Sequence, residues 1–443
     1  MLRTRGCHIN RRRVGAVVML AVGFSLTFVV FSKSTFQVRT SARWQISRLE
    51  RRCCPSEKKT STVKFFKTVE GQDTFLYSAI VNHEEPVHGE INIIITAFDS
   101  TATDDLTCCV VMNNKKLYTT TASVYYKYYI EEYFSSVLEM FKNAPTKAKQ
   151  YSCVVPQIGF QASHVMLTSS SCPETLEDYL PVIYPRKVPD GLAICAKASF
   201  GDKLNPNILM EWFEMQRLLG VDKIQLMDLH NPEPIQKVFR YYTDLGLLDL
   251  LPYELPGEPA PPFIYPYPLQ ASHDETFPIL DCRQRLAGYT FVLGHDMDEI
   301  AIPARHIDLK TFFKEQLQVY PDAAGFYFWT EFFVYDWGPE NNNSDITIFR
   351  YLNSTPPRWE CKKYVYLPNR VSQARTHAFT PRSPYRTYNL PQEEILLHHY
   401  RVCPHVWDTC NTPKITDSSV LRFREILVAR LEQARVATGI RPK

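Results

Sequence analysis

The sequence predicts an α/β protein: a mixed, mainly parallel sheet with flanking helices, preceded by a small β-rich domain and an N-terminal transmembrane helix. Strand-like and helix-like segments alternate from Leu192 to Leu251, the order of a parallel sheet with helical crossovers. Short β-branched and aromatic runs fill the region from Val63 to Pro185. Residues 14–31 carry no charge.

These features divide the chain into six parts. They are a cytosolic tail (1–13), a transmembrane signal-anchor (14–31), a stem (32–60), a β-rich accessory domain (61–188), an α/β catalytic domain (189–405) and a C-terminal tail and helix (406–443).

The composition is that of an ordinary globular protein. Of the 443 residues, 45% are hydrophobic and 22% are charged. The net charge of +3 is small, so we expect no nucleic-acid partner, because such partners normally need a strongly basic face. The chain contains neither G-x-G-x-x-G nor G-x-x-x-x-G-K-[ST], which argues against Rossmann dinucleotide binding and P-loop chemistry.

The N-terminal apolar stretch is expected to anchor the chain in a membrane. As a helix, residues 14–31 would be about 27 Å long, enough for a thin bilayer of the early secretory pathway. Five arginines precede this stretch, so the positive-inside rule places the N-terminus in the cytosol and the rest of the chain in the lumen. A cleavable signal peptide is the alternative, but such peptides usually have a shorter apolar region and a small-residue cleavage site.

The cysteines also favour an oxidising lumen. There are twelve, and none form C-x-x-C, which weakens zinc-ribbon and thioredoxin-like interpretations. Cys7 lies before the membrane segment, which leaves an odd number beyond it. One cysteine is therefore expected either to stay free or to bond another chain. Cys53 and Cys54 in the stem are the pair expected to link two copies of the chain as a disulfide-bonded homodimer. The other pairings stay open. Two N-glycosylation sequons, at Asn342 and Asn353, would face the same lumen.

The β-rich domain is predicted to be a small sandwich. Its expected strands are 91–96, 107–112, 118–129 and 164–168. Such a domain could bind carbohydrate through aromatic faces or serve as a packing spacer, and the spacer is favoured slightly.

The α/β domain begins with a regular alternation of elements. Its expected segments are a strand at 192–196, a helix at 207–219, a strand at 223–227, a helix at 234–245, a strand at 247–251 and a helix around 277–286. Gly220 and Gly246 follow the first two helices, as C-terminal caps do. A charged amphipathic helix at 418–435 is expected to pack on this domain.

A short buried-type strand, Tyr289 to Leu293, leads into the most polar segment of this domain. It is followed by His295, Asp296, Asp298 and Glu299. Two carboxylates so close together are costly unless a positive charge lies between them. A divalent cation, Mn²⁺ or Mg²⁺, that binds the diphosphate of a nucleotide-sugar fits this pattern. The alternative is that the two aspartates only end the strand in a turn.

The order and spacing of several blocks resemble glycosyltransferase family 92, also called the domain of unknown function 23 family. The blocks, which lie between Leu192 and Arg401, are Asp281-Cys-Arg283, His295-Asp-Met-Asp-Glu299, Phe326-Tyr-Phe-Trp329, Lys363 to Val371 and Leu397-His-His-Tyr-Arg401. The resemblance implies a GT-A fold, metal dependence and inverting transfer of galactose from UDP-galactose to a glycan acceptor, with a β-1,4 linkage to fucose or galactose as one form. It also implies a type II Golgi membrane protein.

In this interpretation the metal ligands are Asp296 and Asp298, and Asp296 also contacts the nucleotide-sugar. GT-A enzymes often add a late histidine to the metal, for which His399 is the first candidate, ahead of His398 and His377. Glu299 is expected to orient the loop by hydrogen bonding rather than to bind the ion.

Other acids and bases are assigned to the donor and the acceptor. Glu331, within an apolar run that would raise its pKa, and Asp336 are the candidates for the base that takes the acceptor proton. Asp228, at a strand end, is expected to bind uracil or ribose, and Arg283 is expected to bind phosphate. Each of these residues could instead have a purely structural role.

Two other functions are alternatives to a glycosyltransferase. A glycoside hydrolase needs two carboxylates on opposite sides of a sugar bond, about 5–9.5 Å apart, which two aspartates at one strand end do not provide. A non-catalytic glycan-binding protein, or pseudoenzyme, would bind sugar without releasing UDP.

Overall fold

The computed structural model describes residues 67–69, 73–82, 89–99, 105–127, 147–156, 159–200, 204–229, 231–254, 276–403 and 408–441. The predicted cytosolic tail, membrane helix and stem, with Cys53 and Cys54, lie outside these ranges. No helix within the described ranges is long and apolar enough to cross a membrane.

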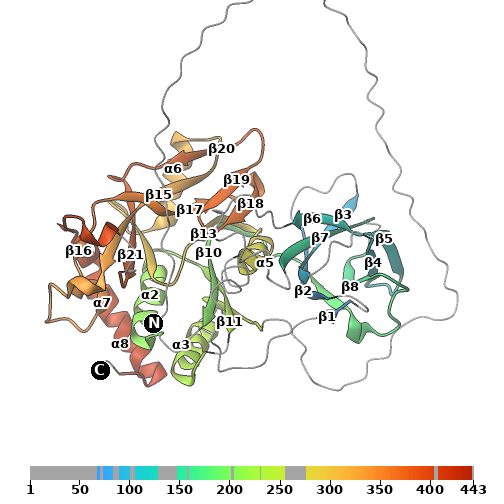
Figure 1. Ribbon diagram of the computed structural model, residues 1–443, viewed down its shortest axis with the longest axis horizontal. Coiled ribbons are helices and arrows are strands. Elements are labelled where there is room, and N and C mark those ends of the chain that lie inside the picture. The colour runs from blue at the N-terminus through green and yellow to red at the C-terminus, as the bar shows by residue number, and fades with distance from the viewer. Residues whose placement is uncertain are drawn as a thin grey trace, which may run out of the picture.

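Two bodies are visible, a β-rich one and an α/β one, with helix α5 between them (Figure 1). The β-rich body is one sheet of nine strands in the order β5-β4-β8-β9-β2-β3-β7-β6, with β1 beside β2. The strands are β1 (Lys67–Thr68), β2 (Thr74–Val81), β3 (Glu90–Asp99), β4 (Thr107–Met112), β5 (Leu117–Thr121), β6 (Ser123–Lys127), β7 (Lys147–Pro156), β8 (Ala162–Thr168) and β9 (Leu180–Ile183).

The expected two-layered packing is present, although the strands form one continuous sheet rather than two separate ones. Strands β4 and β7 are far apart in the strand order, yet the Cys108–Cys153 disulfide joins them, with the two Cα atoms 5.9 Å apart. The sheet must therefore curl over on itself. The neighbouring Cys109 forms a second disulfide, to Cys172.

The α/β body is built on an eleven-stranded sheet, with β12-β11-β10-β13-β17-β15-β16-β22 as its main path; β14, β20 and β21 join off this path. Its strands are β10 (Val188–Phe200), β11 (Lys223–Leu229), β12 (Leu248–Pro252), β13 (Tyr289–Gly294), β14 (Glu299–Pro303), β15 (Ala323–Val334), β16 (Asn353–Ser354), β17 (Arg358–Tyr366), β20 (Arg386–Asn389), β21 (Ile395–Arg401) and β22 (Ile415–Thr416). A separate hairpin consists of β18 (Val371–Arg375) and β19 (Ala378–Pro381).

The helices of this body are α2 (Pro206–Leu218), α3 (Glu233–Asp244), α5 (Phe277–Arg285), α6 (Leu309–Val319), α7 (Thr347–Arg350) and α8 (Arg424–Thr438). The first half of the body confirms the predicted alternation, because β10, β11, β12 and β13 pair in parallel and α2 and α3 connect them. Helix α2 begins where the Asn205 side chain accepts a bond from the Asn207 N–H, as an N-cap does. It ends before Gly220, which has a φ of 84°.

The second half of the sheet is less parallel than expected. Strand β17 runs antiparallel to both β13 and β15, and β14 runs antiparallel to β21, whereas β15 and β21 are parallel. The sheet is therefore evenly mixed, and β21 lies between β14 and β15.

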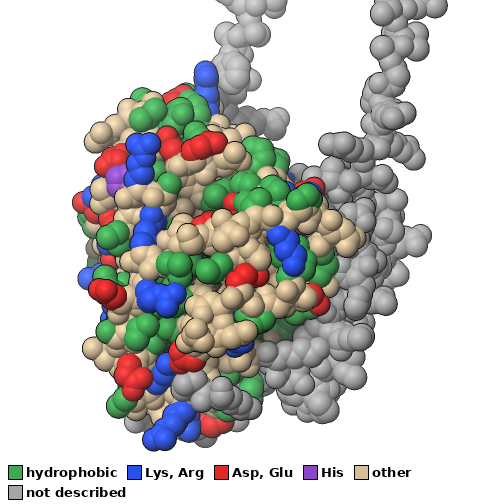
Figure 2. Space-filling view, turned by 90° about the vertical axis from the view of Figure 1, so that its left-hand side faces the viewer, with side chains coloured by type: hydrophobic (Ala, Val, Ile, Leu, Met, Phe, Trp, Pro, Cys, Tyr) green, Lys and Arg blue, Asp and Glu red, His purple; other side chains and the backbone are tan. Residues whose placement is uncertain are grey.

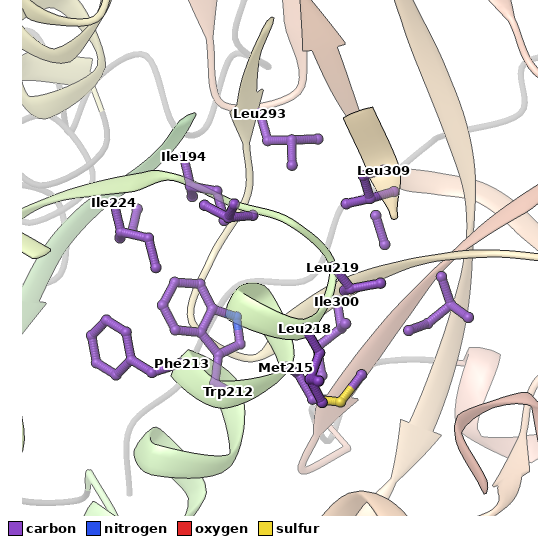
Figure 3. Packing of buried hydrophobic residues seen from close by; sticks show 14 of the residues in the cluster. Ile194, Trp212, Phe213, Met215, Leu218, Leu219, Ile224, Leu293, Ile300 and Leu309 are labelled. Carbon is purple, nitrogen blue, oxygen red and sulfur yellow. The ribbon is translucent and has the colours of Figure 1, made fainter. Parts of the chain in front are cut away.

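The main core lies between this sheet and helices α2, α3, α6 and α8. Trp212, Phe213 and Met215 of α2 pack against strand residues such as Ile194 and Ile224, all of them at most 2% exposed (Figure 3). Burial of these apolar side chains, each worth roughly 1.5–3 kcal/mol, holds the helix on the sheet.

Helix α5 packs on the other side, against the β-rich body. Its Phe277 ring stacks on Phe98 of β3, with 4.0 Å between ring centroids, and the Gln150 side chain donates to the backbone oxygen of Leu280. The Cys195–Cys282 disulfide ties α5 to β10. The β-rich body is thus fixed, through α5, to β10, an inner strand of the α/β sheet.

The face seen in Figure 2 carries Lys and Arg side chains interspersed with Asp and Glu. This face has no large patch of a single charge, as the small net charge leads one to expect.

Candidate active site

The aspartate pair follows strand β13 and therefore lies at the carboxyl end of the parallel strands. Strand β13 ends at Gly294, where a Cβ atom would lie 2.7 Å from the Tyr364 ring, so only glycine fits. The chain then turns through Asp296 and Asp298 into β14. His295, at the start of the turn, is fully buried, and burial together with Lys363 lowers its pKa to about 3. His295 is therefore neutral.

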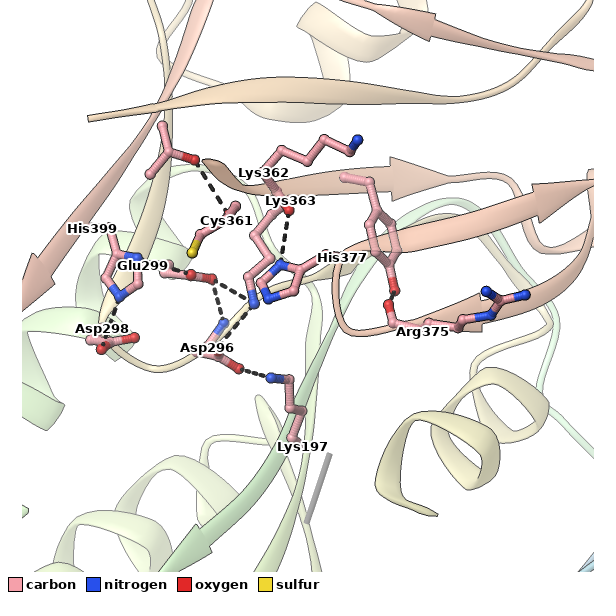
Figure 4. A network of polar contacts seen from close by, with 12 residues as sticks. Lys197, Asp296, Asp298, Glu299, Cys361, Lys362, Lys363, Arg375, His377 and His399 are labelled. Atoms are coloured by element: carbon pink, nitrogen blue, oxygen red, sulfur yellow. Dashed lines mark hydrogen bonds and ion pairs between the residues drawn. The ribbon is translucent and has the colours of Figure 1, made fainter. Parts of the chain in front are cut away.

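The register of β14 and β21 brings a histidine to this turn. Glu299 is paired with His399, and His399 Nε2 lies 3.2 Å from Asp298 Oδ2 (Figure 4). His399 Nδ1 lies 3.3 Å from Glu299 Oε1 without the geometry of a hydrogen bond. One ligand atom from each of the three residues falls within 4.8 Å of the others. Burial raises the pKa of Asp298, but His399 outweighs it and the net shift is downward.

Glu299 orients the turn, as the sequence suggested. Its Oε2 accepts the backbone N–H of Asp296 at 2.8 Å, and its own backbone oxygen accepts the indole N–H of Trp212. The side chain is fully buried, and burial raises the pKa of this carboxyl group. Glu299 also contributes an oxygen to the group with Asp298 and His399. It is therefore a candidate metal ligand as well, which the sequence analysis did not predict.

Asp296 has different partners from Asp298. Its Oδ1 is 2.8 Å from Lys197 Nζ and its Oδ2 is 2.9 Å from Lys363 Nζ (Figure 4). Burial would raise the pKa of Asp296, but the two lysines hold it well below its usual range. Asp296 is therefore an ionised carboxylate that two protein cations already neutralise.

His377, at the tip of the β18–β19 hairpin, lies beside Lys363 in Figure 4. Its Nδ1 is 3.2 Å from the backbone oxygen of Lys362. Burial and the two nearby lysines lower its pKa well below the usual value, so it is neutral.

Glu331 belongs to a second group, with His398 and Asp417. In the pairing of β15 with β21, Glu331 is next to His398, whereas the following residue of each strand, Phe332 and His399, form the next pair. Successive residues of a strand point to opposite faces, so Glu331 and His398 lie on the face opposite His399. The structure does not bring Glu331 to the aspartate pair.

The surroundings of Glu331 are those of a structural contact. Its Oε2 accepts the hydroxyl of Ser354 at 3.1 Å, and Asp417 accepts from His398 Nε2 at 3.1 Å. Burial and the neighbouring Asp417 raise the pKa of Glu331 to about 8. The pKa of Glu331 is therefore raised, as the apolar run leads one to expect. Glu331, however, belongs to a group that holds the segment before α8 to the sheet.

Asp336 follows β15 in a 3-10 turn, Tyr335–Trp337, and its Oδ2 accepts the backbone N–H of Cys403 at 2.6 Å. Cys403 and Trp337 pack against Phe332, whose ring also contacts His399, with centroids 5.4 Å apart. Asp336 therefore lies beside the apolar cluster on the His399 side of the sheet.

Besides Asp296, the residues predicted to bind the nucleotide-sugar are Asp228 and Arg283, and both have protein contacts in the structure. Asp228, at the end of β11, accepts from the side-chain amides of Asn231 at 2.6 Å and Gln236 at 2.7 Å. Arg283 of α5 is buried and donates to the backbone oxygen of Val371 at 2.7 Å. Asp228 stands at the carboxyl end of a parallel strand, whereas Arg283 joins α5 to the β18–β19 hairpin.

The sequence reasoning missed Lys197 and Lys363. Lys197 directly follows the buried run Gly191–Ala196 of β10, and Lys363 directly precedes the buried run Tyr364–Tyr366 of β17. A lysine in or beside such a run is almost never buried unless it is paired. A lysine beside such a run can be recognised in the sequence, whereas its ion pair with Asp296 cannot.

Carboxylates, histidines and paired lysines gathered at strand ends are typical of an enzyme site. Residues 190–426, more than half of the chain, match the model of glycosyltransferase family 92. The protein belongs to this family and is a glycosyltransferase that acts on a donor and an acceptor. No individual curated protein matches the chain.

Proposed function

We propose that this protein transfers galactose from UDP-galactose to a glycan of a glycoprotein or glycolipid, with inversion at the anomeric carbon and with Mn²⁺ or Mg²⁺ as cofactor. The observation that carries the proposal is the group formed by Asp298, Glu299 and His399 where β13 turns into β14. In parallel α/β sheets, ligands collect at this edge.

The donor set fits a divalent cation. Two carboxylates and one imidazole supply the hard oxygens and the single nitrogen that Mn²⁺ accepts. Glu299 Oε1 and His399 Nδ1 are buried and have no hydrogen-bond partner, so ligand atoms are available there. When bound, such an ion would stabilise the negative charge of the departing diphosphate.

The residues of the chain itself have two further tasks. The carboxylate of Asp336, on the His399 side of the sheet, is our candidate for the base that takes the proton from the acceptor hydroxyl. Asp228, near the carboxyl end of β11, is our candidate for binding the uracil or ribose of the donor.

The test is release of UDP from a panel of nucleotide-sugars by the full-length protein, with Mn²⁺ or with EDTA. We expect UDP-galactose to be consumed in the presence of Mn²⁺ and the reaction to stop with EDTA. Consumption of another UDP-sugar would correct the donor. Binding of glycans without UDP release would identify a non-catalytic protein, and hydrolysis of glycosides without metal would identify a hydrolase.

We also propose that the protein is a single-pass type II membrane protein of the Golgi, linked as a homodimer through its stem. Residues 14–31 and the four disulfides that join described cysteines support this proposal. Co-localisation with Golgi markers and non-reducing electrophoresis of Cys53→Ser and Cys54→Ser variants would test it.

A further inference from the structure

The first aspartate of the pair has both of its oxygens engaged. Lys197 Nζ lies 2.8 Å from one oxygen of Asp296, and Lys363 Nζ lies 2.9 Å from the other. Each oxygen keeps a further lone pair, but a cation bound there would lie beside a lysine ammonium group and be repelled by it. Asp296 is also absent from the carboxylate–histidine group formed by the described residues around Asp298.

The two lysines differ in burial. The Lys363 side chain is 1% exposed, and its Nζ also lies 3.4 Å from Glu299 Oε2, so it is fixed between two carboxylates. The side chains of Lys197 and Asp296 are 10% and 34% exposed. A ligand from solvent could therefore reach the Lys197–Asp296 pair, whereas Lys363 is enclosed by protein.

The backbone at both lysines is irregular. Lys197 has a φ of 62°, and the register between β10 and β11 shifts between Cys195 and Ala198. Cys361, two residues before Lys363, has a φ of 54°. Positive φ values are uncommon outside glycine, and strained residues of this kind cluster at binding sites, where a bulge re-aims a side chain.

We propose that Lys197 binds the diphosphate of the donor, that Asp296 holds Lys197 in place before the donor arrives, and that Lys363 is a positioning residue for Asp296. This inference rests on the proposed function and assigns residues to it. The three carboxylates of the site (Asp296, Asp298 and Glu299) would repel an incoming diphosphate, and a lysine that can turn toward it would offset this repulsion together with the bound ion. Lys197 would exchange one charge-assisted hydrogen bond for another of the same kind.

The experiment is calorimetric binding of UDP and of uridine to the full-length protein with Mn²⁺. Lys197→Met should weaken UDP binding about tenfold or more and leave uridine binding within about twofold, because uridine has no phosphate. Lys362→Met is the matched control. Lys362 lies over the rings of Tyr327 and Trp359, so this variant removes the same charge without touching Asp296.

Lys197→Gln is the second variant in case the methionine variant fails to fold, and the same selective loss is expected. Lys197→Arg, which keeps the charge, should retain most of the UDP affinity. The proposal is overturned if Lys197→Met or Lys197→Gln binds UDP like the wild type, or loses UDP and uridine equally. If the wild-type protein binds neither ligand, the proposed function itself fails, and that result is distinct from the others.

Discussion

Asp296 and Asp298 are two residues apart, yet their partners divide the site into two parts. Lys197 and Lys363 neutralise Asp296, whereas Asp298 faces His399. The lysines of the protein therefore neutralise Asp296, whereas Asp298 is the carboxylate that we expect an ion to bind. Because the two carboxylates have different charged partners, each substitution should have a distinct effect.

Asp298→Asn tests the ion-binding half. The amide keeps the shape of the side chain but removes the negative charge, so we expect UDP release to fall by about a hundredfold or more. The half-saturating Mn²⁺ concentration should also rise. Titration of Mn²⁺ in a UDP-release assay measures both quantities. Asp190→Asn, the same change at an exposed position paired with Lys314, is the control. Near-normal turnover of Asp298→Asn would remove the metal role.

The asparagines of the two sequons differ in their hydrogen bonds and exposure. Asn353 Nδ2 donates to Glu340 at 2.6 Å, and its Oδ1 accepts from the Thr416 hydroxyl at 2.9 Å. Asn342 is exposed. We expect a glycan on Asn342 and none on Asn353. The electrophoretic shift after N-glycosidase treatment should vanish in Asn342→Gln and persist in Asn353→Gln; the reverse pattern would contradict the structure.

At the scale of single elements, β21 is the strand that serves two groups. Its neighbouring residues His398 and His399 face opposite sides, so one strand supports both the group around Asp298 and the group that holds the segment before α8. Glu331, on β15, shares the second of these faces.

Glu331→Gln separates a structural from a catalytic role. The Glu331 carboxyl group has a pKa of about 8 in the fold against 4.5 for an ordinary glutamate. It is protonated in the fold but ionised in the unfolded chain between these values, so the fold loses stability as pH rises through this window. Glutamine does not ionise, so the stability of Glu331→Gln does not fall for this reason in the same pH window. Its melting temperature should exceed that of the wild type by about 2–4 °C near pH 7.5 and match it near pH 4.5.

Turnover of Glu331→Gln is expected to stay close to that of the wild type, because the residue faces away from His399. Glu425→Gln, an exposed change on α8, serves as the control for the melting curves. A large loss of turnover at unchanged stability would return the role of base to Glu331.

Most of the first half of the α/β sheet was predictable from the sequence. Strand β13 and helices α2 and α3 have strong local patterns, and their boundaries are within one or two residues of those expected. The second half depends on pairings between distant segments. Whether Glu331 or Phe332 faces the site depends on the register of β15 with β21, and a shift of one residue reverses the answer. No local pattern contains that register.

At the scale of the whole molecule, α5 joins the β-rich body to the catalytic sheet. Phe277 is fully buried against Phe98, and the Cys195–Cys282 disulfide holds the same helix to the strand that carries Lys197. This arrangement favours a fixed spacer over a freely moving carbohydrate-binding module.

Phe277→Ala is expected to loosen that junction. Removal of a fully buried phenylalanine typically costs about 3–5 kcal/mol, and the loss here should fall on the contact between the two bodies. Thermal unfolding should then show two transitions in the variant and one in the wild type. Phe160→Ala, at a side chain that is 43% exposed, should leave the curve unchanged. A single, unshifted transition in Phe277→Ala would mean that the bodies are not coupled through α5.

The adjacent cysteines of β4 provide a marker that needs no crystal. Cys108 is bonded to Cys153 and Cys109 to Cys172, so the partners identify which thiol stands at which place along the strand. If β4 slid by one position, one cysteine would take its neighbour's place and the other would lose its partner, so the two bonds could not both form. Mass spectrometry of the unreduced, protease-digested protein would therefore report the alignment of β4 within its sheet, because this alignment joins the Cys108–Cys109 peptide to the peptides of both Cys153 and Cys172.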